Sequence, residues 1–127
     1  MWPTHCVVGT SGADYHKDLN VKPSDKEILK GTVKMVESYS GFGGDGEETG
    51  LDKYLKSQGV KRCFCVGLAY DYCVGSTAED SAKLGYTTYL IEDASRSVNS
   101  ESKAGMNKRL MAAGVNVINQ KELSQFN

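Results

Sequence analysis

The chain has 127 residues, which is the size of one domain and excludes two independently folded domains. Hydrophobic residues make up 39% and charged residues 24% of it, an ordinary globular composition that excludes a disordered tail and a coiled coil. Its 15 basic and 16 acidic side chains give a formal net charge of -1, so we expect a small-molecule ligand and neither nucleic acid nor a membrane as partner. Residues 1–127 are therefore predicted to form a single domain.

The sequence predicts a cytoplasmic protein with reduced thiols. No run approaches the roughly 18 apolar residues of a membrane span, and the chain does not open on a basic region followed by an apolar stretch. A chain with this much apolar content does not need disulfide bonds to fold. We therefore expect free thiols at the four cysteines, Cys6, Cys63, Cys65 and Cys73.

The first half of the sequence shows little periodicity. The short stretch Glu27–Lys30, Glu-Ile-Leu-Lys before Gly31, is predicted to be a strand. Residues 41–50 contain five glycines and are predicted to form a flexible loop.

The second half alternates apolar runs with amphipathic stretches. Each amphipathic stretch ends in a glycine, which is typical of a helix closed by a left-handed residue. Strands joined by helices of this length run parallel, so the pattern predicts an α/β fold with helices covering the sheet faces. The expected strands are Arg62–Leu68, Thr87–Ile91 and Val115–Ile118, and the glycines that end the expected helices are Gly59, Gly85 and Gly114. The first of these strands is continuously apolar and is predicted to be buried on both faces.

Ligands of open α/β sheets bind beyond the carboxyl ends of the strands, which draws attention to Cys73. This cysteine follows the strand that ends at Leu68 and stands at or near the N-terminus of the next helix. A helix N-terminus favours a thiolate over a thiol, so Cys73 is a candidate nucleophile. A small buried side chain with no chemical role is the competing interpretation for any cysteine taken alone.

Other polar residues carry weaker signals. Lys30 ends a predicted strand and could stabilise a thiolate, although most lysines are simply solvated. His5 is a candidate metal ligand, although a lone histidine is more often a hydrogen-bonded residue without a metal. Cys63 and Cys65 are two residues apart, so they lie on the same face of the predicted strand, and they are predicted to pack in the core. The spacing of the histidine and cysteines does not predict a structural zinc site.

Three ordered segments resemble the nicotinamidase/pyrazinamidase family of isochorismatase-like cysteine hydrolases. The opening Trp-Pro-Thr-His-Cys segment, residues 2–6, is similar to the family's metal-ligand segment. Lys30-Gly31 and the later Tyr-Ser-Gly-Phe run, residues 39–42, resemble the catalytic lysine and pocket-lining residues. Residues 66–74, Val-Gly-Leu-Ala-Tyr-Asp-Tyr-Cys-Val, resemble the nucleophile segment. The resemblance extends over nearly the whole chain and implies a three-layer α/β/α, Rossmann-like fold with a mostly parallel sheet.

The resemblance also implies hydrolysis of nicotinamide, and of pyrazinamide-like amides, to the acid and ammonia in NAD salvage. Cys73 is then the nucleophile, Lys30 its partner, and the N–H groups of Ala69 and Cys73 face the oxyanion after a cis Leu68–Ala69 peptide bond. Trp2 and Tyr72 are implied to pack against the pyridine ring.

The remaining implied roles concern the pocket lining and the metal. Tyr39 is implied to line the pyridine pocket. His5 is implied to bind a divalent ion that holds the pyridine nitrogen, with zinc placed ahead of iron and manganese.

One departure from the family pattern changes what is expected of this chain. The family places an Asp-x-Gln strand with the catalytic aspartate, and further metal ligands, before the Trp-Pro segment, whereas only Met1 precedes Trp2 here. We therefore expect a chain that lacks the N-terminal strands and is catalytically weak, with Lys30 displaced from Cys73. The alternatives are a different isochorismatase-like amidohydrolase and a non-catalytic fragment that binds partners through its open sheet edge. Each of these interpretations is compatible with a homo-oligomer.

Overall fold

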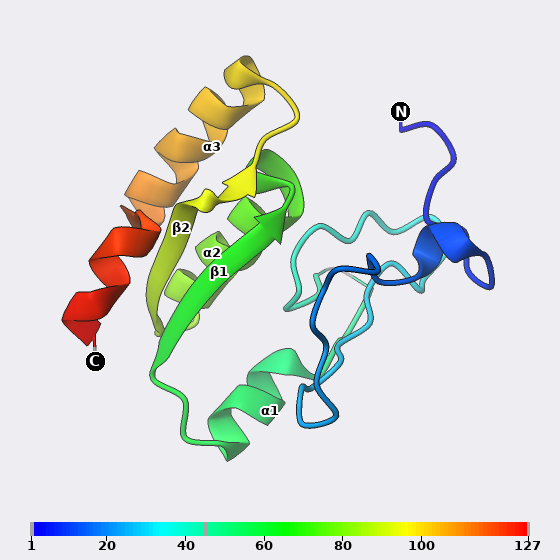
Figure 1. Cartoon of the computed structure of the whole chain (residues 1–127), viewed down its shortest axis with the longest axis horizontal. Helices are drawn as coiled ribbons and strands as arrows, with labels where there is room; N and C mark the ends of the chain where they lie inside the picture. Colours follow the sequence, from blue (N-terminus) through cyan, green and yellow to red (C-terminus); the bar gives the residue numbers. More distant parts are fainter. Residues whose placement is uncertain (1, 45, 127) are drawn as a thin grey trace.

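The computed structural model describes residues 2–44 and 46–126 and contains one α/β unit with a long N-terminal segment (Figure 1). Its helices are α1, Leu51–Ser57; α2, Gly75–Lys83; and α3, Ser100–Ala113. Its strands are β1, Arg62–Leu68; β2, Thr87–Arg96; and β3, Asn116–Ile118. The structure also contains three short helical segments: η1, Ser11–Ala13; η2, Tyr70–Val74; and η3, Gln120–Phe126.

The sheet is parallel and has the order β1-β2-β3, which confirms the prediction from the crossover lengths. Cys65 stands opposite Leu90 in the first pair, and Leu90 stands opposite Val117 in the second. β1 agrees with the predicted bounds, whereas β2 continues to Arg96 and β3 begins one residue late. The register shifts between Cys65 and Gly67, just before the chain leaves β1.

The helices α2 and α3 pack on one face of the sheet and form the core with it (Figure 1). Gly75 is required at their contact, because a Cβ atom there would lie 2.5 Å from the Met106 side chain and from the Tyr70 carbonyl. The buried cluster consists of Tyr70, Val74, Ala78, Leu90, Met106, Leu110 and Val115. Gly59, Gly85 and Gly114 follow the three helices with φ of 69, 98 and 84°, as their positions in the sequence predict.

The prediction that β1 is buried on both faces is wrong. Exposed and half-buried residues alternate along it, and Phe64, Val66 and Leu68 are exposed. The reason is that α2 and α3 lie on the Cys65 face, whereas the opposite face is contacted at one end by η3. There Phe126 meets the stacked rings of Phe64 and Tyr89 at centroid distances of 5.2 and 4.7 Å.

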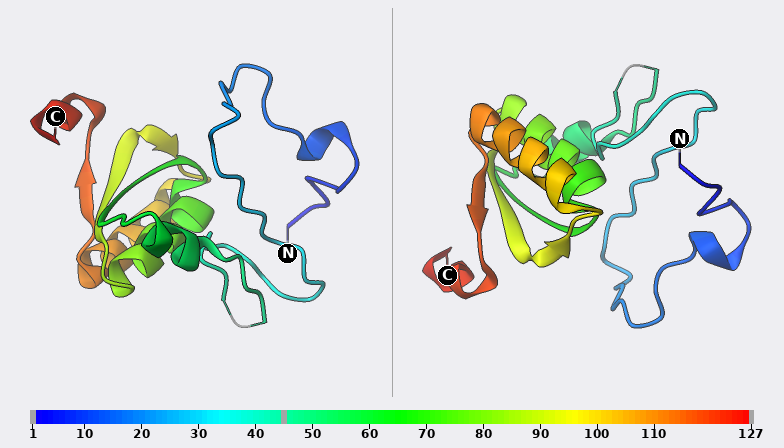
Figure 2. Two further views of the ribbon diagram at one scale, coloured as in Figure 1. Left: turned by 90° about the horizontal axis from the view of Figure 1, so that it is seen from below. Right: turned by 90° about the horizontal axis from the view of Figure 1, so that it is seen from above.

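The N-terminal segment runs beside this unit as extended chain and turns (Figure 2). The predicted strand Glu27–Lys30 is wrong, because these residues have no strand partner in the described chain and adopt no regular structure. Every residue from 2 to 27 is exposed. Polar contacts hold the segment locally, such as the hydrogen bond that Tyr15 donates to the Glu27 carboxylate.

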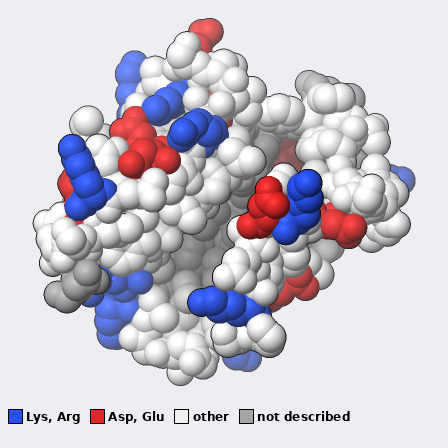
Figure 3. Space-filling model, in the orientation of Figure 1, with Lys and Arg blue, Asp and Glu red and all other residues white. Residues whose placement is uncertain are grey.

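The surface is hollowed between the N-terminal segment and the body formed by the sheet and helices (Figure 3). Lysine, arginine, aspartate and glutamate side chains are intermixed on this face (Figure 3), in keeping with the near-zero net charge. None of the described helices has the length and apolar character needed to cross a membrane.

Candidate active site

The η2 turn carries Cys73 directly beyond the carboxyl end of β1. The Leu68–Ala69 peptide bond is cis, as the resemblance implies, and the Ala69 carbonyl accepts hydrogen bonds from Tyr72 N–H and Val74 N–H. Cys73 thus lies in a five-residue π-helical turn that continues into α2, which places it near the N-terminus of that helix, as expected. The wider turn places Tyr70 in the core and leaves Tyr72 and Cys73 half-buried.

Asp71 anchors the same turn to the start of α3. Its buried carboxylate accepts hydrogen bonds from the N–H groups of Val98 and Asn99 and from the Ser102 hydroxyl. Burial alone raises the pKa of Asp71, but these hydrogen bonds outweigh it and lower that pKa below its ordinary value. Sequence reasoning missed this role, because the partners lie 27 to 31 residues further along the chain.

Lys30 lies against Cys73. Its Nζ atom donates to Cys73 Sγ at 3.2 Å and to the Ser38 carbonyl at 2.7 Å. The expectation that loss of the strand displaces Lys30 is therefore wrong, because the hydrogen bond to Ser38 holds the ammonium group without a strand. Within the described part of the chain, no ion pair involves Lys30.

Three predicted aromatic residues meet next to this pair. The ring centroids of Trp2 and Tyr72 are 4.9 Å apart and those of Tyr39 and Tyr72 are 5.5 Å apart. Trp2 Nε1–H also donates to the Tyr39 hydroxyl at 3.2 Å. Together with Glu37 they line a cavity of about 360 Å³. Residues separated by up to 70 positions therefore form one aromatic wall.

His5 is near this wall, with its ring centroid 6.3 Å from that of Trp2. Its Nδ1 atom lies 2.6 Å from the Pro3 carbonyl oxygen, so Nδ1 is the donor and Nε2 is the atom left to bind a metal. Among residues 2–44 and 46–126, no three His, Cys, Asp or Glu side chains are grouped as a metal site. The described residues thus supply one candidate ligand, which does not fit a metal centre of three or more protein ligands.

Thr77 links the N-terminal segment to the turn that carries Cys73, and Glu47 makes hydrogen bonds within the N-terminal segment itself. Thr77 Oγ1 donates to the Cys73 carbonyl at 2.7 Å and accepts from Gly41 N–H at 2.8 Å. Glu47 is buried, and its carboxylate accepts hydrogen bonds from Thr32 and Ser38, which lie two and eight residues after Lys30 in the same segment. The glycine-rich loop predicted to be flexible therefore carries defined contacts; its residue Asp45 lies outside the described residues.

All four cysteines are free, as predicted, but they differ in environment. Cys65 packs against the core, and burial, followed by the neighbouring Cys63, raises the pKa of the Cys65 thiol to about 12. This thiol therefore stays protonated and inert at neutral pH. Cys73 differs from Cys65 because the Lys30 Nζ atom lies 3.2 Å from the Cys73 Sγ atom.

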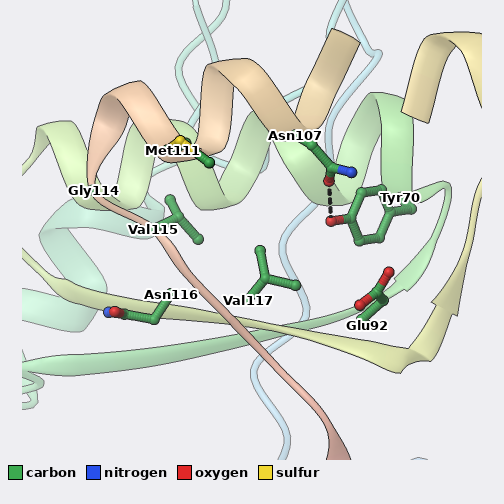
Figure 4. Close-up of a pocket in the computed structure, with 8 residues that line it drawn as sticks. All are labelled: Tyr70, Glu92, Asn107, Met111, Gly114, Val115, Asn116 and Val117. Carbon is green, nitrogen blue, oxygen red and sulfur yellow. Dashed lines mark hydrogen bonds between the residues drawn. The ribbon is translucent and has the colours of Figure 1, made fainter. Parts of the chain in front are cut away.

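A larger cavity, of about 440 Å³, lies away from Cys73 between α3 and the β3 edge (Figure 4). At one end of it the Tyr70 hydroxyl donates to Asn107 Oδ1 at 2.5 Å, and Val115 and Val117 form its apolar side. None of the residues predicted to be functional lines this cavity.

Known proteins resemble the chain over almost all of its length. A nicotinamidase from Acinetobacter baylyi is 35% identical over 126 residues, which are 97% of this chain and 59% of that protein. A nicotinamidase/pyrazinamidase from Mycobacterium tuberculosis is 35% identical over 118 residues, with 92% and 62% of the two chains covered. The chain thus spans about three fifths of the length of these curated relatives.

Solved structures give the same result for the fold. An Acinetobacter baumanii nicotinamidase/pyrazinamidase superposes with a TM-score of 0.91 at 37% identity, over 97% of this chain and 61% of that one. An L. infantum protein in complex with nicotinate gives 0.90 at 37% identity, over 95% and 62%. A Pyrococcus horikoshii pyrazinamidase in complex with zinc gives 0.83 at 34% identity, over 94% and 63%. These neighbours confirm the predicted α/β fold class. The model of the isochorismatase domain matches residues 1–122, and the chain therefore belongs to the isochorismatase family.

Proposed function

We propose that the site hydrolyses the carboxamide of nicotinamide, with Cys73 as the nucleophile. The observation that carries this proposal is the 3.2 Å contact between Lys30 Nζ and Cys73 Sγ beside the aromatic wall of Trp2, Tyr39 and Tyr72. A cationic neighbour stabilises a thiolate at neutral pH, and flat aromatic side chains suit a pyridine ring. Relatives named as nicotinamidases support the choice of substrate.

The chemistry proceeds in two halves. Cys73 Sγ attacks the carboxamide carbon, the C–N bond breaks and ammonia leaves; water then cleaves the thioester, and nicotinate is released with the thiol restored. The N–H groups of Ala69 and Cys73 belong to the turn that presents Sγ and are the proposed donors to the oxyanion. Lys30 holds the thiolate, and Trp2, Tyr39 and Tyr72 orient the ring.

Two ligand-bound neighbours support a small pyridine as the substrate class. One was solved with nicotinate, and a yeast nicotinamidase was solved with the inhibitor nicotinaldehyde. A pyrazinamidase neighbour was solved with zinc, but among the described residues of this chain His5 belongs to no group of three or more possible ligands. We propose His5 as one ligand of a divalent ion and assign no chemical step to that ion.

Turnover tests the proposal directly. The chain is incubated with nicotinamide, and nicotinate and ammonia are measured together. We expect equal amounts of both products, slowly formed, and none from Cys73→Ala. Cys63→Ala is the matched control, because Cys63 is a half-buried cysteine on β1 with no Lys30 contact, and this variant should retain the parental rate.

A second measurement does not need turnover. Nicotinaldehyde, whose aldehyde carbon accepts a thiol, should protect Cys73 from alkylation by iodoacetamide, as mapped by peptide mass spectrometry. Benzaldehyde, which lacks the ring nitrogen, should protect it less. Parental turnover by Cys73→Ala would overturn the proposal, and so would a parent that neither turns over nor shows protection of Cys73.

A further inference from the structure

Glu47 is a buried carboxylate in a segment that has almost no other buried residue. Its Oε1 atom accepts from Thr32 N–H at 2.9 Å and from the Thr32 hydroxyl at 3.1 Å, and its Oε2 atom accepts from the Ser38 hydroxyl. The Ser38 hydrogen bond is the largest cause that lowers the pKa of Glu47, followed by the Thr32 N–H, so the group is a carboxylate at neutral pH. None of these partners carries a charge.

These contacts join the two ends of the turn that follows Lys30. Thr32 lies two residues after Lys30, and Ser38 is the residue whose carbonyl accepts from Lys30 Nζ at 2.7 Å. Glu47 therefore fixes the distance between the Lys30 backbone and the acceptor of the Lys30 side chain. The same ammonium group then donates to Cys73 Sγ at 3.2 Å.

In the part of this segment that the structure describes, no strand or buried apolar side chain performs this task. The Glu27–Lys30 run is irregular, and residues 31–35 are exposed. A lysine side chain on such a segment samples many rotamers unless its ammonium group is held. The more rotamers it samples, the smaller is the fraction of time that Nζ lies against the Cys73 sulfur. Hydrogen bonds to a carboxylate are stronger than those between neutral groups, which suits Glu47 to hold a segment without a core.

We propose that Glu47 is a positioning residue, which acts on Cys73 through Thr32, Ser38 and Lys30. The inference rests on the proposed function only in taking Lys30 and Cys73 as the reactive pair. It predicts that Glu47 affects the reactivity of Cys73 while Lys30 is present and has no such effect once Lys30 is removed.

The test measures the rate at which iodoacetamide alkylates Cys73 at pH 7, with the modified cysteine identified by peptide mass spectrometry. Glu47→Ala should slow alkylation about tenfold, the size of coupling expected between residues of one network. Glu48→Ala is the matched control, because it removes the same charge from an exposed neighbouring position and should leave the rate unchanged. Circular dichroism and the urea midpoint report the folding of each variant.

A double-mutant cycle separates positioning from general destabilisation. Lys30→Met should slow alkylation by itself, and Glu47→Ala in that background should add no further slowing. Additive effects would overturn the proposal, as would an unchanged rate in Glu47→Ala. If Glu47→Ala unfolds the chain, Glu47→Gln replaces it in the cycle, because it keeps an acceptor for Thr32 and weakens the Ser38 bond. Because alkylation needs no substrate, failure of nicotinamide turnover leaves this result intact.

Discussion

The described residues from 2 to 50 and those from 51 to 126 differ in what they bury. In the first region the buried residues are Ser40 and Glu47, which are both polar. Every buried hydrophobic residue of the described chain lies in the second region, between Tyr70 and Ile118. Hydrogen bonds therefore hold the first region, whereas apolar burial holds the second.

The candidate site joins these two regions. Cys73 and Tyr72 come from a turn packed on the core, whereas Lys30, Tyr39 and Trp2 come from the segment without a core. A single hydrogen bond contributes about 0.5–1.5 kcal/mol net, and burying a large apolar side chain contributes about 1.5–3 kcal/mol. We therefore expect the nucleophile to be the more rigid half of the site and its partners to be the more easily lost.

The largest expected effect is on the core. Leu110 is fully buried against the sheet, and Leu110→Ala should lower the free energy of unfolding by about 2–5 kcal/mol. Val8→Ala makes a similar truncation at a side chain that is 91% exposed, and it should change that free energy by less than about 0.5 kcal/mol. Urea denaturation followed by circular dichroism measures both. Equal losses in the two variants would mean that the first region has a core after all.

The next effect concerns the link between the regions. Thr77→Val keeps the shape of the side chain but removes the hydroxyl that bonds Gly41 N–H and the Cys73 carbonyl. It should cost about 1 kcal/mol of unfolding free energy and slow alkylation of Cys73. Thr87→Val, at an exposed position that begins β2, is the control and should do neither. A Thr77→Val variant with parental Cys73 reactivity would show that the link is not needed.

Acid should act on the first region through Glu47 and on the second through Asp71, together with Asp52 and Glu79, whose pKa values are also lowered. The pKa values of Glu47 and Asp71 lie below the ordinary 4.5 and 3.8, so folding favours their ionised forms. Their stabilisation is fully present above those ordinary values and is lost as the pH falls through the lowered folded-state values. The urea midpoint should therefore decrease below about pH 4.5. Glu47→Gln and Asp71→Asn should each flatten this decrease; a profile as steep as the parent's in both would contradict the assignment.

The smallest effect is expected for the metal. A single imidazole on an exposed segment is a weak ligand, so the chain dialysed against zinc should retain far less than one ion per molecule. His5→Ala should lower this small amount further, as measured by metal analysis after dialysis. Near-stoichiometric zinc that is lost in His5→Ala would reveal ligands beyond His5.

The sheet and its helices were predictable because their signals are local. The apolar run of β1, the glycines after the helices and the length of each crossover lie within short stretches of sequence, and together they determine a parallel order. Burial of β1 on both faces was not predictable, because it depends on what covers Phe64, Val66 and Leu68. An apolar run shows that a strand can be buried and does not show what buries it.

The site was predictable in part. The residues of the three resembling segments, Trp2, Lys30, Tyr39, Tyr72 and Cys73, do come together. Glu47 and Asp71 were missed, because a carboxylate in a glycine-rich loop or between two tyrosines carries no local sign of its partners. The position of Lys30 was wrongly expected to depend on a strand, whereas a hydrogen bond to Ser38 holds it.

By itself, the sequence determined the order of strands and helices and the set of side chains available for chemistry, since periodicity, turn residues and residue type are written in short stretches of chain. Only the tertiary structure decided which of those side chains touch. Lys30 meets Cys73 across 43 positions, and Glu47 organises the turn between Thr32 and Ser38. Such contacts depend on where distant backbone segments lie in space. A hydrogen bond needs a donor–acceptor distance of about 3 Å, so a backbone shift of about 1 Å is enough to break it.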